Sequence, residues 1–556
     1  MKIEDMISAN RADCNGCAAC ANICPKNAIT MTRDAEGFSY PKINPELCDK
    51  CGRCDATCPT LNFKKNNPAD FPLTFVTNVP ADKILRHSSS GGVFTALSEL
   101  ILRKGGVVFG AAFDENWRVF HTAARTFDEL NKLRGSKYVQ SRIGDIYRQV
   151  RDALKSTQVL FSGTPCQCAG LRHFLGSDHE NLLTVEIICH GTPSPAVWES
   201  YIGNIGYAHE VTGVNFRSKR NGWTEYVDIN FADRAHIASS GNKNIFSRLS
   251  LIGMSNRPSC SACKFKYPDG QSDLTLGDAW GVKDFAPEMF DSRGTSAVII
   301  HTDKGRKFFE RMNLRAKRVK FFDAIQKNPR CISSIVADPR RAEFFAEFAA
   351  ADKFAVMEKY FAQDDAELRK EIGKQNGAAF KAAYRAIVAS VRKKFTKNIL
   401  VVSPLDDGAK AFLIDHFAQT VPNGTLYFLR LNDKGELICR ENFSTLDLPI
   451  KSEVAALKDF AKKFNIVQVV AGDPMNLNAP AVAEWLKVCG LPVQVLENDS
   501  AQEVAEVQDT VTAARKKFTK NILVVSPLDD GAKEFLIDHF AQTVPNGTLY
   551  FLRLND

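Results

Sequence analysis

Two cysteine runs with the same spacing lie close together near the start of the chain. Residues 14–25 read CNGCAACANICP, and residues 48–59 read CDKCGRCDATCP. Both follow C-x2-C-x2-C-x3-C-P, in which three cysteines bind one cube of iron and sulfide and the fourth reaches a second cube. The proline after the fourth cysteine ends the loop and fixes its turn. This pattern restricts the fold more than any other feature of the sequence.

The shared spacing predicts two [4Fe-4S] clusters whose fourth ligands are exchanged. We expect one cluster to be bound by Cys14, Cys17, Cys20 and Cys58, and the other by Cys48, Cys51, Cys54 and Cys24. Zinc knuckles are an alternative, but zinc gives no reason for the repeated C-x3-C-P ending. Residues 1–62 resemble bacterial two-cluster ferredoxins, which transfer electrons one at a time.

A disulfide scaffold is the other alternative for these cysteines. Disulfides need an oxidising compartment. The opening residues MKIEDMISANRADC lack the apolar segment of a secretory signal. We therefore expect a cytoplasmic protein whose clustered thiols bind metal.

The composition is that of a globular protein. The 556 residues are 44% hydrophobic and 24% charged, near the average for folded domains, and this length suits roughly three or four domains. No run approaches the ~18 uninterrupted apolar residues of a membrane helix. The net charge of +8 is mild for this length. We expect neither a membrane span nor a nucleic-acid partner.

Five more cysteines follow strand-like segments or lie in loops of the middle region. They are Cys166 and Cys168 in VLFSGTPCQCAGL, Cys189 in VEIICHGTPSP, and Cys260 and Cys263 in CSAC. Each alone reads as a buried apolar thiol. As a set they favour a third metal site, because four ligands hold one more cluster and C-x2-C is a usual ligand pair.

A Ser/Gly loop precedes an expected helix in the same region. Residues 84–110 read ILRHSSSGGVFTALSELILRKGGVVFG, with apolar residues at helical spacing from Val93 to Leu102. Such a loop presents free N–H groups to an anion. An ordinary capped helix explains the loop more simply, so the loop alone does not establish a site.

Seven short sequence segments, called phrases below, resemble one known family. In order they are SSSGGVFTAL, GSKYVQS, FSGTPCQCAGL, CHGTPSP, CSACKFK, SDLTLGDAWG and GTSAVII. Together they resemble the family of coenzyme F420 hydrogenase/dehydrogenase beta subunits, where F420 denotes a deazaflavin cofactor. The resemblance covers roughly residues 73–335, and members with an attached dicluster ferredoxin are familiar.

The resemblance implies an α/β flavoprotein that binds FAD beside a [4Fe-4S] cluster. Carried onto this chain, the ligands of a third cluster are Cys166, Cys189, Cys260 and Cys263, which leaves Cys168 as a spare. The residues expected to contact the flavin are Ser90, Gly91, Gly92, Gly135, Ser136, Lys137 and Tyr138. No catalytic proton donor is identified.

Four polar residues in these phrases each have two interpretations. Lys137 offers positive charge to a phosphate or to reduced flavin, or it is a solvated surface lysine. Thr164 and His190 donate hydrogen bonds to cluster sulfurs, or they satisfy turn backbone. Asp278 orients the cluster loop, or it forms a turn.

The expected fold class is α+β and α/β multidomain: a dicluster ferredoxin fold, an α/β flavin-binding region and a small C-terminal α/β domain. The expected segments are a ferredoxin domain at 1–62, N-terminal-like and C-terminal-like family regions at 73–155 and 156–335, a helical extension at 336–391, an α/β domain of unknown role at 392–514, and a partial repeat at 515–556.

The final segment repeats an earlier one almost unchanged. Residues 515–556 match residues 392–433 at 41 of 42 positions, and the two copies differ only at Ala411 and Glu534. A recent duplication, a sequence-assembly artefact and a strand-exchange device all explain this. We assign the last 42 residues no function.

These features predict an iron–sulfur flavoprotein oxidoreductase. It would pass electrons between a one-electron carrier and a two-electron substrate or deazaflavin-type cofactor, with FAD as the converter. The expected partners are a carrier such as ferredoxin, or a hydrogenase/dehydrogenase partner subunit, together with a small-molecule redox substrate. The alternatives are a non-catalytic electron-transfer subunit of such a complex and, less favoured, a zinc-binding regulatory or scaffold protein.

Overall fold

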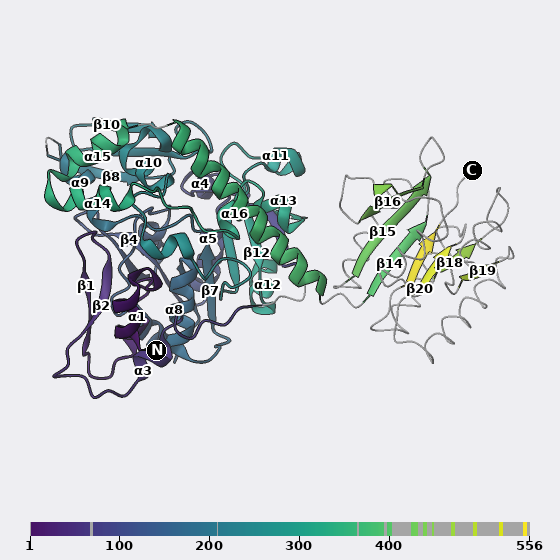
Figure 1. Cartoon of the computed structure of the whole chain (residues 1–556), viewed down its shortest axis with the longest axis horizontal. Helices are drawn as coiled ribbons and strands as arrows, with labels where there is room; N and C mark the ends of the chain where they lie inside the picture. Colours follow the sequence, from purple (N-terminus) through teal and green to yellow (C-terminus); the bar gives the residue numbers. More distant parts are fainter. Residues whose placement is uncertain are drawn as a thin grey trace. The chain divides into compact units, whose positions relative to one another are not determined.

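The computed structural model describes residues 2–393, apart from residues 67–70, 208 and 364–365, and eight strands beyond residue 396. The chain divides into two compact units. One comprises Met1–Asn67 and Phe71–Ile387, and the other Pro68–Asp70 and Val388–Asp556. The ferredoxin-like region and the middle region therefore belong to one unit (Figure 1).

The ferredoxin-like region is built from short elements. They are α1 (Ile3–Ala9), η1 (Arg11–Asp13), α2 (Ala19–Ile23), β1 (Ile29–Arg33), β2 (Ser39–Ile43) and α3 (Arg53–Thr57). Strands β1 and β2 pair antiparallel. Ala18 and Gly52, at matching places in the two cysteine runs, adopt left-handed conformations with φ of 61° and 71°. These two residues turn the chain into α2 and α3, each of which carries the third cysteine of its run.

An eight-stranded mixed sheet forms the centre of the first unit. Its order is β13-β3-β12-β11-β7-β6-β4-β5. The strands are β3 (Leu73–Asn78), β4 (Val107–Phe113), β5 (Val119–Ala124), β6 (Val159–Gly163), β7 (Leu182–Ile187), β11 (Leu274–Asp278), β12 (Ser296–Ile300) and β13 (Arg315–Val319). Strands β4, β6, β7 and β11 run parallel, and the outer strands run antiparallel. The carboxyl ends of the parallel strands therefore share one edge, where ligands usually bind.

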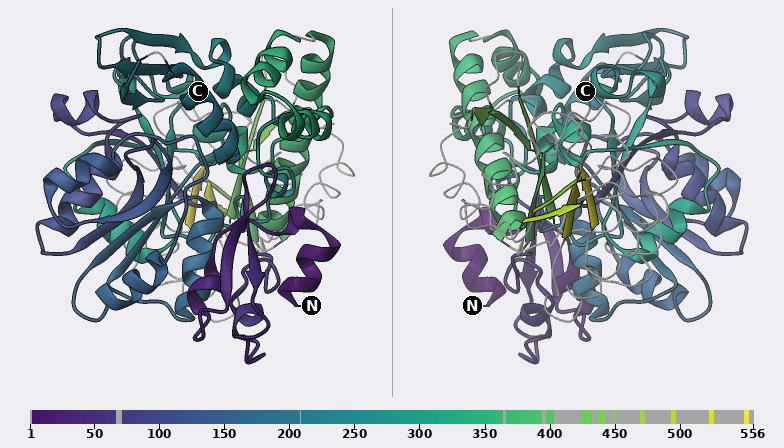
Figure 2. Two further views of the ribbon diagram at one scale, coloured as in Figure 1. Left: turned by 90° about the vertical axis from the view of Figure 1, so that its left-hand side faces the viewer. Right: turned by 90° about the vertical axis from the view of Figure 1, so that its right-hand side faces the viewer.

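Helices cover both faces of this sheet. They are α4 (Asp82–Arg86), α5 (Val93–Leu102), α6 (Phe127–Leu133), α7 (Ile146–Ala153), α8 (Pro165–Leu175), α11 (Val282–Phe285), α12 (Asp303–Glu310) and α13 (Phe321–Ile325). Residues of α5, α6 and α12 share one buried apolar cluster with the sheet. Residues of α7 and α8 share another with the sheet and with Ala18 and Ala19. The ferredoxin-like region thus contributes to the core, and Figure 2 shows it (purple) packed against the blue and teal elements.

A smaller layer stands beside the main sheet. Its antiparallel strands are β8 (Val211–Asn215), β9 (Tyr226–Phe231) and β10 (His236–Ser240), and its helices are α9 (Pro195–Ile205), α10 (Ile245–Leu251), α14 (Arg341–Ala350) and α15 (Lys353–Ala362). An aromatic core that includes Trp198, Phe246 and Phe344 holds them together. The long helix α16 (Ala366–Lys393) follows. In the part of the chain that the structure describes, no helix is long and apolar enough to cross a bilayer.

Beyond the end of α16, the second unit is described by strands alone. They are β14 (Lys397–Val402), β15 (Gly424–Leu431), β16 (Leu437–Glu441), β17 (Leu448–Pro449), β18 (Val469–Gly472), β19 (Val493–Leu496), β20 (Ile522–Val525) and β21 (Leu549–Leu552). Both copies of the repeat form a parallel pair in the same register: Ile399 lies opposite Leu426, and Ile522 opposite Leu549. The second copy therefore pairs within itself. The helices expected between these strands lie outside the described residues.

Candidate functional site

The first predicted cluster site is a small cavity under α1. It has a volume of about 20 Å3 and is lined by Cys14, Cys17, Cys20 and Cys58 together with apolar side chains such as Ile3 and Met6. Burial raises the pKa of the Cys17, Cys20 and Cys58 thiols. Four thiols that line one mainly apolar space fit an iron–sulfur cluster, because bound iron would favour the thiolate that burial alone disfavours.

The second predicted site lies farther from the core. Helices α2 and α3 pack together, which brings Cys24, at the end of α2, toward the run that holds Cys48, Cys51 and Cys54. Cys51 is exposed, and its backbone N–H donates to Asp49 Oδ1 at 3.2 Å. Cys20 and Cys58 of the first site are buried. The two sites therefore differ in access, with the second open to solvent.

Two arginines attach the ferredoxin-like region to the rest of the unit. Arg148 donates from Nε to Asn22 O at 2.6 Å and from Nη2 to Cys24 O at 3.0 Å. Arg257, which is buried, donates from Nε to Cys14 O at 2.8 Å, and its guanidinium lies 4.3 Å from the ring centre of Tyr40. These bonds reach backbone carbonyls beside predicted ligands and fix the position of the cysteine runs.

A third group of cysteines meets at the carboxyl edge of the sheet. Cys166 lies in the first turn of α8 and Cys189 follows β7. Cys260 lies within the 3-10 segment Pro258–Ala262, and Cys263 directly follows it. Burial raises the pKa of Cys166, and the nearby thiols Cys263, Cys189 and Cys17 add to the rise. Cys260 in turn raises the pKa of both Cys189 and Cys263. The four thiols predicted as third-cluster ligands are thus neighbours, and Cys17 of the first site adjoins them.

The start of α8 is built to hold its cysteine in place. Thr164 and Gln167 form a capping box, and Pro165 occupies the first turn. Thr164 Oγ1 lies 3.2 Å from Cys166 Sγ, so the threonine both caps the helix and contacts a predicted ligand. Cys168 is buried and directs its Sγ toward Val185 O on β7, at 3.8 Å. Burial raises the pKa of Cys168, and nearby Cys166 adds to the rise. The assignment of Cys168 as the spare cysteine stays a prediction.

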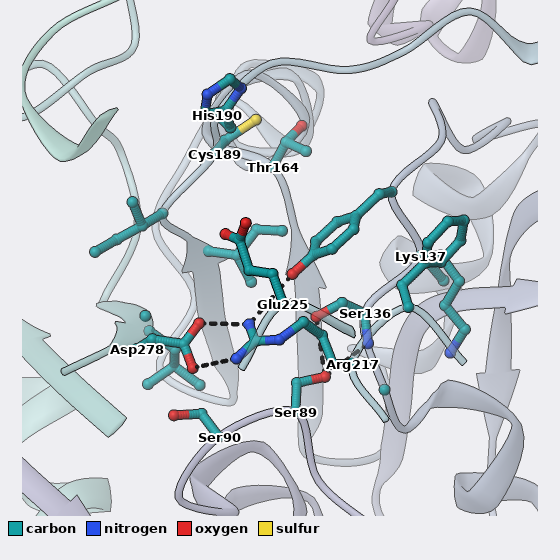
Figure 3. A pocket seen from close by; sticks show the side chains of 18 of the residues that line it. Ser89, Ser90, Ser136, Lys137, Thr164, Cys189, His190, Arg217, Glu225 and Asp278 are labelled. Atoms are coloured by element: carbon teal, nitrogen blue, oxygen red, sulfur yellow. Dashed lines mark hydrogen bonds and ion pairs between the residues drawn. The ribbon is translucent and has the colours of Figure 1, made fainter. Parts of the chain in front are cut away.

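A cavity of about 550 Å3 begins beside this third group. Cys189, His190 and Thr164 line one end of it, and Ser89 and Ser90 line the other (Figure 3). Six of the seven predicted flavin contacts line it: Ser90, Gly92, Gly135, Ser136, Lys137 and Tyr138. The structure therefore brings together, around one cavity, residues that are far apart in the sequence.

Gly91 does not line this cavity. Its N–H donates to Ser296 Oγ at 2.8 Å, and an added Cβ would lie 2.4 Å from Thr77 O. Glycine is needed here because the loop passes directly over the sheet. The role of Gly91 in the structure is thus to position the loop that carries Ser90 and Gly92.

The loop before α5 is tied to the loop that follows α6. Ser136 N and Ser136 Oγ lie 2.9 and 3.0 Å from Ser89 Oγ. Lys137 is half-buried, and its Nζ donates to Lys132 O and Arg134 O at 2.9 and 2.8 Å. Burial lowers the pKa of Lys137 to about 7. Its amine is therefore engaged by backbone carbonyls rather than fully solvated.

A buried ion pair forms one wall of the cavity, and the sequence did not reveal it. Arg217 donates to both carboxylate oxygens of Asp278, at 2.6 and 3.0 Å, and to Tyr138 Oη at 3.3 Å. Trp223 Nε1 donates to Asp278 Oδ1 at 2.8 Å. Glu225 also lines the cavity, and burial raises its pKa. Arg217 and Glu225 lie outside the seven recognised phrases, so no sequence signal marked them.

Three protein-family models match this chain. Residues 13–62 match a 4Fe-4S dicluster domain. Residues 74–146 match the N-terminal region, and residues 156–325 the C-terminal region, of the coenzyme F420 hydrogenase/dehydrogenase beta subunit. These matches confirm both resemblances inferred from the sequence, together with the mixed α/β fold that carries a 4Fe-4S region at its start.

Characterised relatives match different parts of the chain. A subunit of the F(420)H(2) dehydrogenase of Methanosarcina mazei is 23% identical over 309 residues, which cover 53% of this chain and 81% of that protein. Ketoisovalerate oxidoreductase subunit VorC of Methanothermobacter marburgensis is 34% identical over 55 residues, 10% of this chain and 70% of the relative. A chain of the F420-reducing [NiFe] hydrogenase complex of Methanosarcina barkeri aligns over 53% of this chain and 94% of its own length, with 15% identity and a TM-score of 0.33.

Proposed function

Because residues 74–146 and 156–325 belong to the family of coenzyme F420 hydrogenase/dehydrogenase beta subunits and residues 13–62 form a 4Fe-4S dicluster domain, we propose that this chain is an iron–sulfur flavoprotein oxidoreductase. It passes electrons between a one-electron carrier and a two-electron substrate or deazaflavin-type cofactor. FAD in the cavity of about 550 Å3 would be the converter. The membership itself supports a redox subunit that transfers electrons through iron–sulfur clusters.

The observation that carries the proposal is the continuous series of thiol groups leading to the cavity. The exposed site with Cys51 lies outermost, and the buried site with Cys17 comes next. Cys17 then adjoins Cys166, and Cys189 of the same third group lines the cavity. This order favours one-electron relays that end beside a cofactor able to handle two electrons.

The residues around the cavity fit a dinucleotide cofactor. The volume lies within the ordinary range for cofactor sites, and the lining combines apolar side chains with a few fixed polar groups. The first turn of α5 presents its N-terminus to the cavity through Gly92 and Val93, a suitable place for a phosphate. Bound FAD would supply the exchange between hydride and single-electron transfer. The bidentate pair of Arg217 and Asp278 holds one wall of the cavity in place.

A non-catalytic electron-transfer subunit is the second candidate. Two of the relatives that match are named as subunits, one of an F(420)H(2) dehydrogenase and one of a ketoisovalerate oxidoreductase. In that case this chain would serve a separate hydrogenase or dehydrogenase and would turn over no substrate alone. The match of residues 13–62 to a 4Fe-4S dicluster domain disfavours a zinc-binding regulatory protein.

Anaerobic purification with iron, sulfide and flavin analysis tests the proposal. We expect about twelve iron atoms per chain, four for each of three cubane clusters, and one FAD. Iron without flavin would favour the second candidate, and the purified chain would then reduce no deazaflavin or hydride acceptor. Zinc in place of iron would refute both candidates.

A further inference from the structure

A buried lysine, Lys266, lies next to the third group of cysteines. Lys266 follows Cys263 by three residues and is only 9% exposed. Its Nζ donates to the backbone oxygens of Cys189 and Arg330, the latter at 2.7 Å. Among the described residues, no carboxylate forms an ion pair with Lys266 within 4 Å. The ammonium group is thus buried, held by two carbonyls and without an acidic partner in direct contact.

Burying an ammonium group costs free energy unless negative charge lies nearby. Burial raises the pKa of both Cys189 and Cys263, and the positive charge of Lys266 opposes that rise. The other acidic group within reach is Glu186, which is buried, and burial raises its pKa to about 7. Glu186 Oε1 accepts a hydrogen bond from Thr275 at 2.8 Å. Cys189 and Cys263 are therefore among the groups on which the charge of Lys266 acts, together with Glu186, His190 and the buried thiol Cys331.

We propose that Lys266 tunes the reduction potential of the third cluster by placing one fixed positive charge behind Cys189. This inference rests on the proposed function, because it requires a cluster at Cys166, Cys189, Cys260 and Cys263. Reduction adds one electron and therefore one negative charge to the site. A buried cation stabilises the reduced form, since a poorly polarisable interior screens its charge weakly. Lys266 is a positioning residue that acts through electrostatics and exchanges no proton in this step.

The same loop offers a matched control. Lys264 lies two residues earlier, and its side chain is 41% exposed. It pairs with Asp13 at 3.8 Å on the surface. Water and salt screen exposed charges strongly, so neutralising Lys264 removes the same formal charge with little effect on the buried site.

Redox titration of the anaerobically purified full chain, followed by electron paramagnetic resonance, tests the proposal. In Lys266→Gln we expect the equilibrium constant for reducing the third cluster to fall at least tenfold, which is 59 mV for one electron. Lys266→Arg keeps the charge and should stay within about threefold of wild type, as should Lys264→Gln. The two ferredoxin clusters serve as internal references and should not shift. A Lys266→Gln potential equal to wild type would overturn the proposal.

Measuring the iron content of each variant distinguishes a failure of this inference from a failure of the proposed function. If wild-type protein holds iron for the two ferredoxin clusters only, the third cluster does not exist. The inference then fails because Lys266 has no cluster to act on. If Lys266→Gln loses the third cluster while Lys266→Arg retains it at wild-type potential, the charge is required and the inference stands. Loss of the cluster in both variants would assign Lys266 a purely structural role and overturn it.

Discussion

Gly170 marks the contact between the first ferredoxin site and helix α8, and it allows a sharp test. A Cβ added at Gly170 would lie 2.9 Å from Tyr147 Oη and 3.0 Å from both Cβ and Sγ of Cys17. Tyr147 is fully buried and donates to Gln167 O at 2.8 Å, so its ring cannot move aside freely. Gly170→Ala must therefore push Cys17 and α8 apart.

The size of the effect follows from a matched comparison. Gly203, in α9, is an exposed helical glycine whose added Cβ would meet no atom within 4 Å. Both substitutions gain about 0.5–1 kcal/mol of helix stability from replacing glycine with alanine. Only Gly170→Ala also carries the cost of overpacking, about 1–3 kcal/mol in a well-packed core. The difference between the two variants isolates that steric cost.

Anaerobic urea unfolding, followed by loss of iron–sulfur absorbance and by tryptophan fluorescence, measures this difference. We expect Gly203→Ala to be at least as stable as wild type and Gly170→Ala to unfold at lower urea, by about 1–3 kcal/mol relative to Gly203→Ala. We also expect weaker magnetic coupling between the reduced first and third clusters in Gly170→Ala. Equal stability of the two variants, with unchanged coupling, would refute the close contact between Cys17 and α8.

Three further predictions concern other parts of the first unit. Cys263→Ser should lower the iron content by about four atoms per chain, whereas Cys168→Ser should leave it unchanged. Loss of iron in Cys168→Ser would instead make Cys168 a cluster ligand and Cys263 the spare cysteine. Asp278→Asn should lower stability by about 3 kcal/mol, because Arg217 would remain buried with no carboxylate; an unchanged urea midpoint would contradict this. Burial lowers the pKa of His121 to about 4 from an ordinary 6.5, so the unfolded chain binds the proton first and stability falls as pH drops below 6.5. Between pH 6.5 and 5 this loss should be about 1.5 kcal/mol and should disappear in His121→Gln; an equal pH dependence in both proteins would contradict it.

Much of the candidate site was predictable because local spacing carries its chemistry. The two C-x2-C-x2-C-x3-C-P runs identify a dicluster domain without any tertiary information, since each run is a single loop with its own ligand pattern. The Ser/Gly loop and the GSKY phrase were predicted to contact one flavin, and the structure places both around one cavity. That flavin remains a proposal. Arg217 and Glu225 were missed because isolated charged residues carry no pattern in the sequence. Lys266 lies in the recognised phrase CSACKFK but was not singled out, because nothing in the phrase distinguishes it from Lys264.

The sequence by itself determined the dicluster iron–sulfur pattern, the resemblance of residues 73–335 to one family and the alternation of strands and helices, all of which depend on residues close together in the chain. Only the tertiary structure decided which thiols are neighbours across long separations and which side chains face the cavity. It packed Ala18 and Ala19 into the core beside α7 and α8, and this placed Cys17 against Gly170. The physical reason is that such contacts arise from packing of apolar surfaces and burial of charge, which depend on the whole fold. The order of the thiol groups, from exposed Cys51 to cavity-lining Cys189, is therefore a property of the fold rather than of either motif.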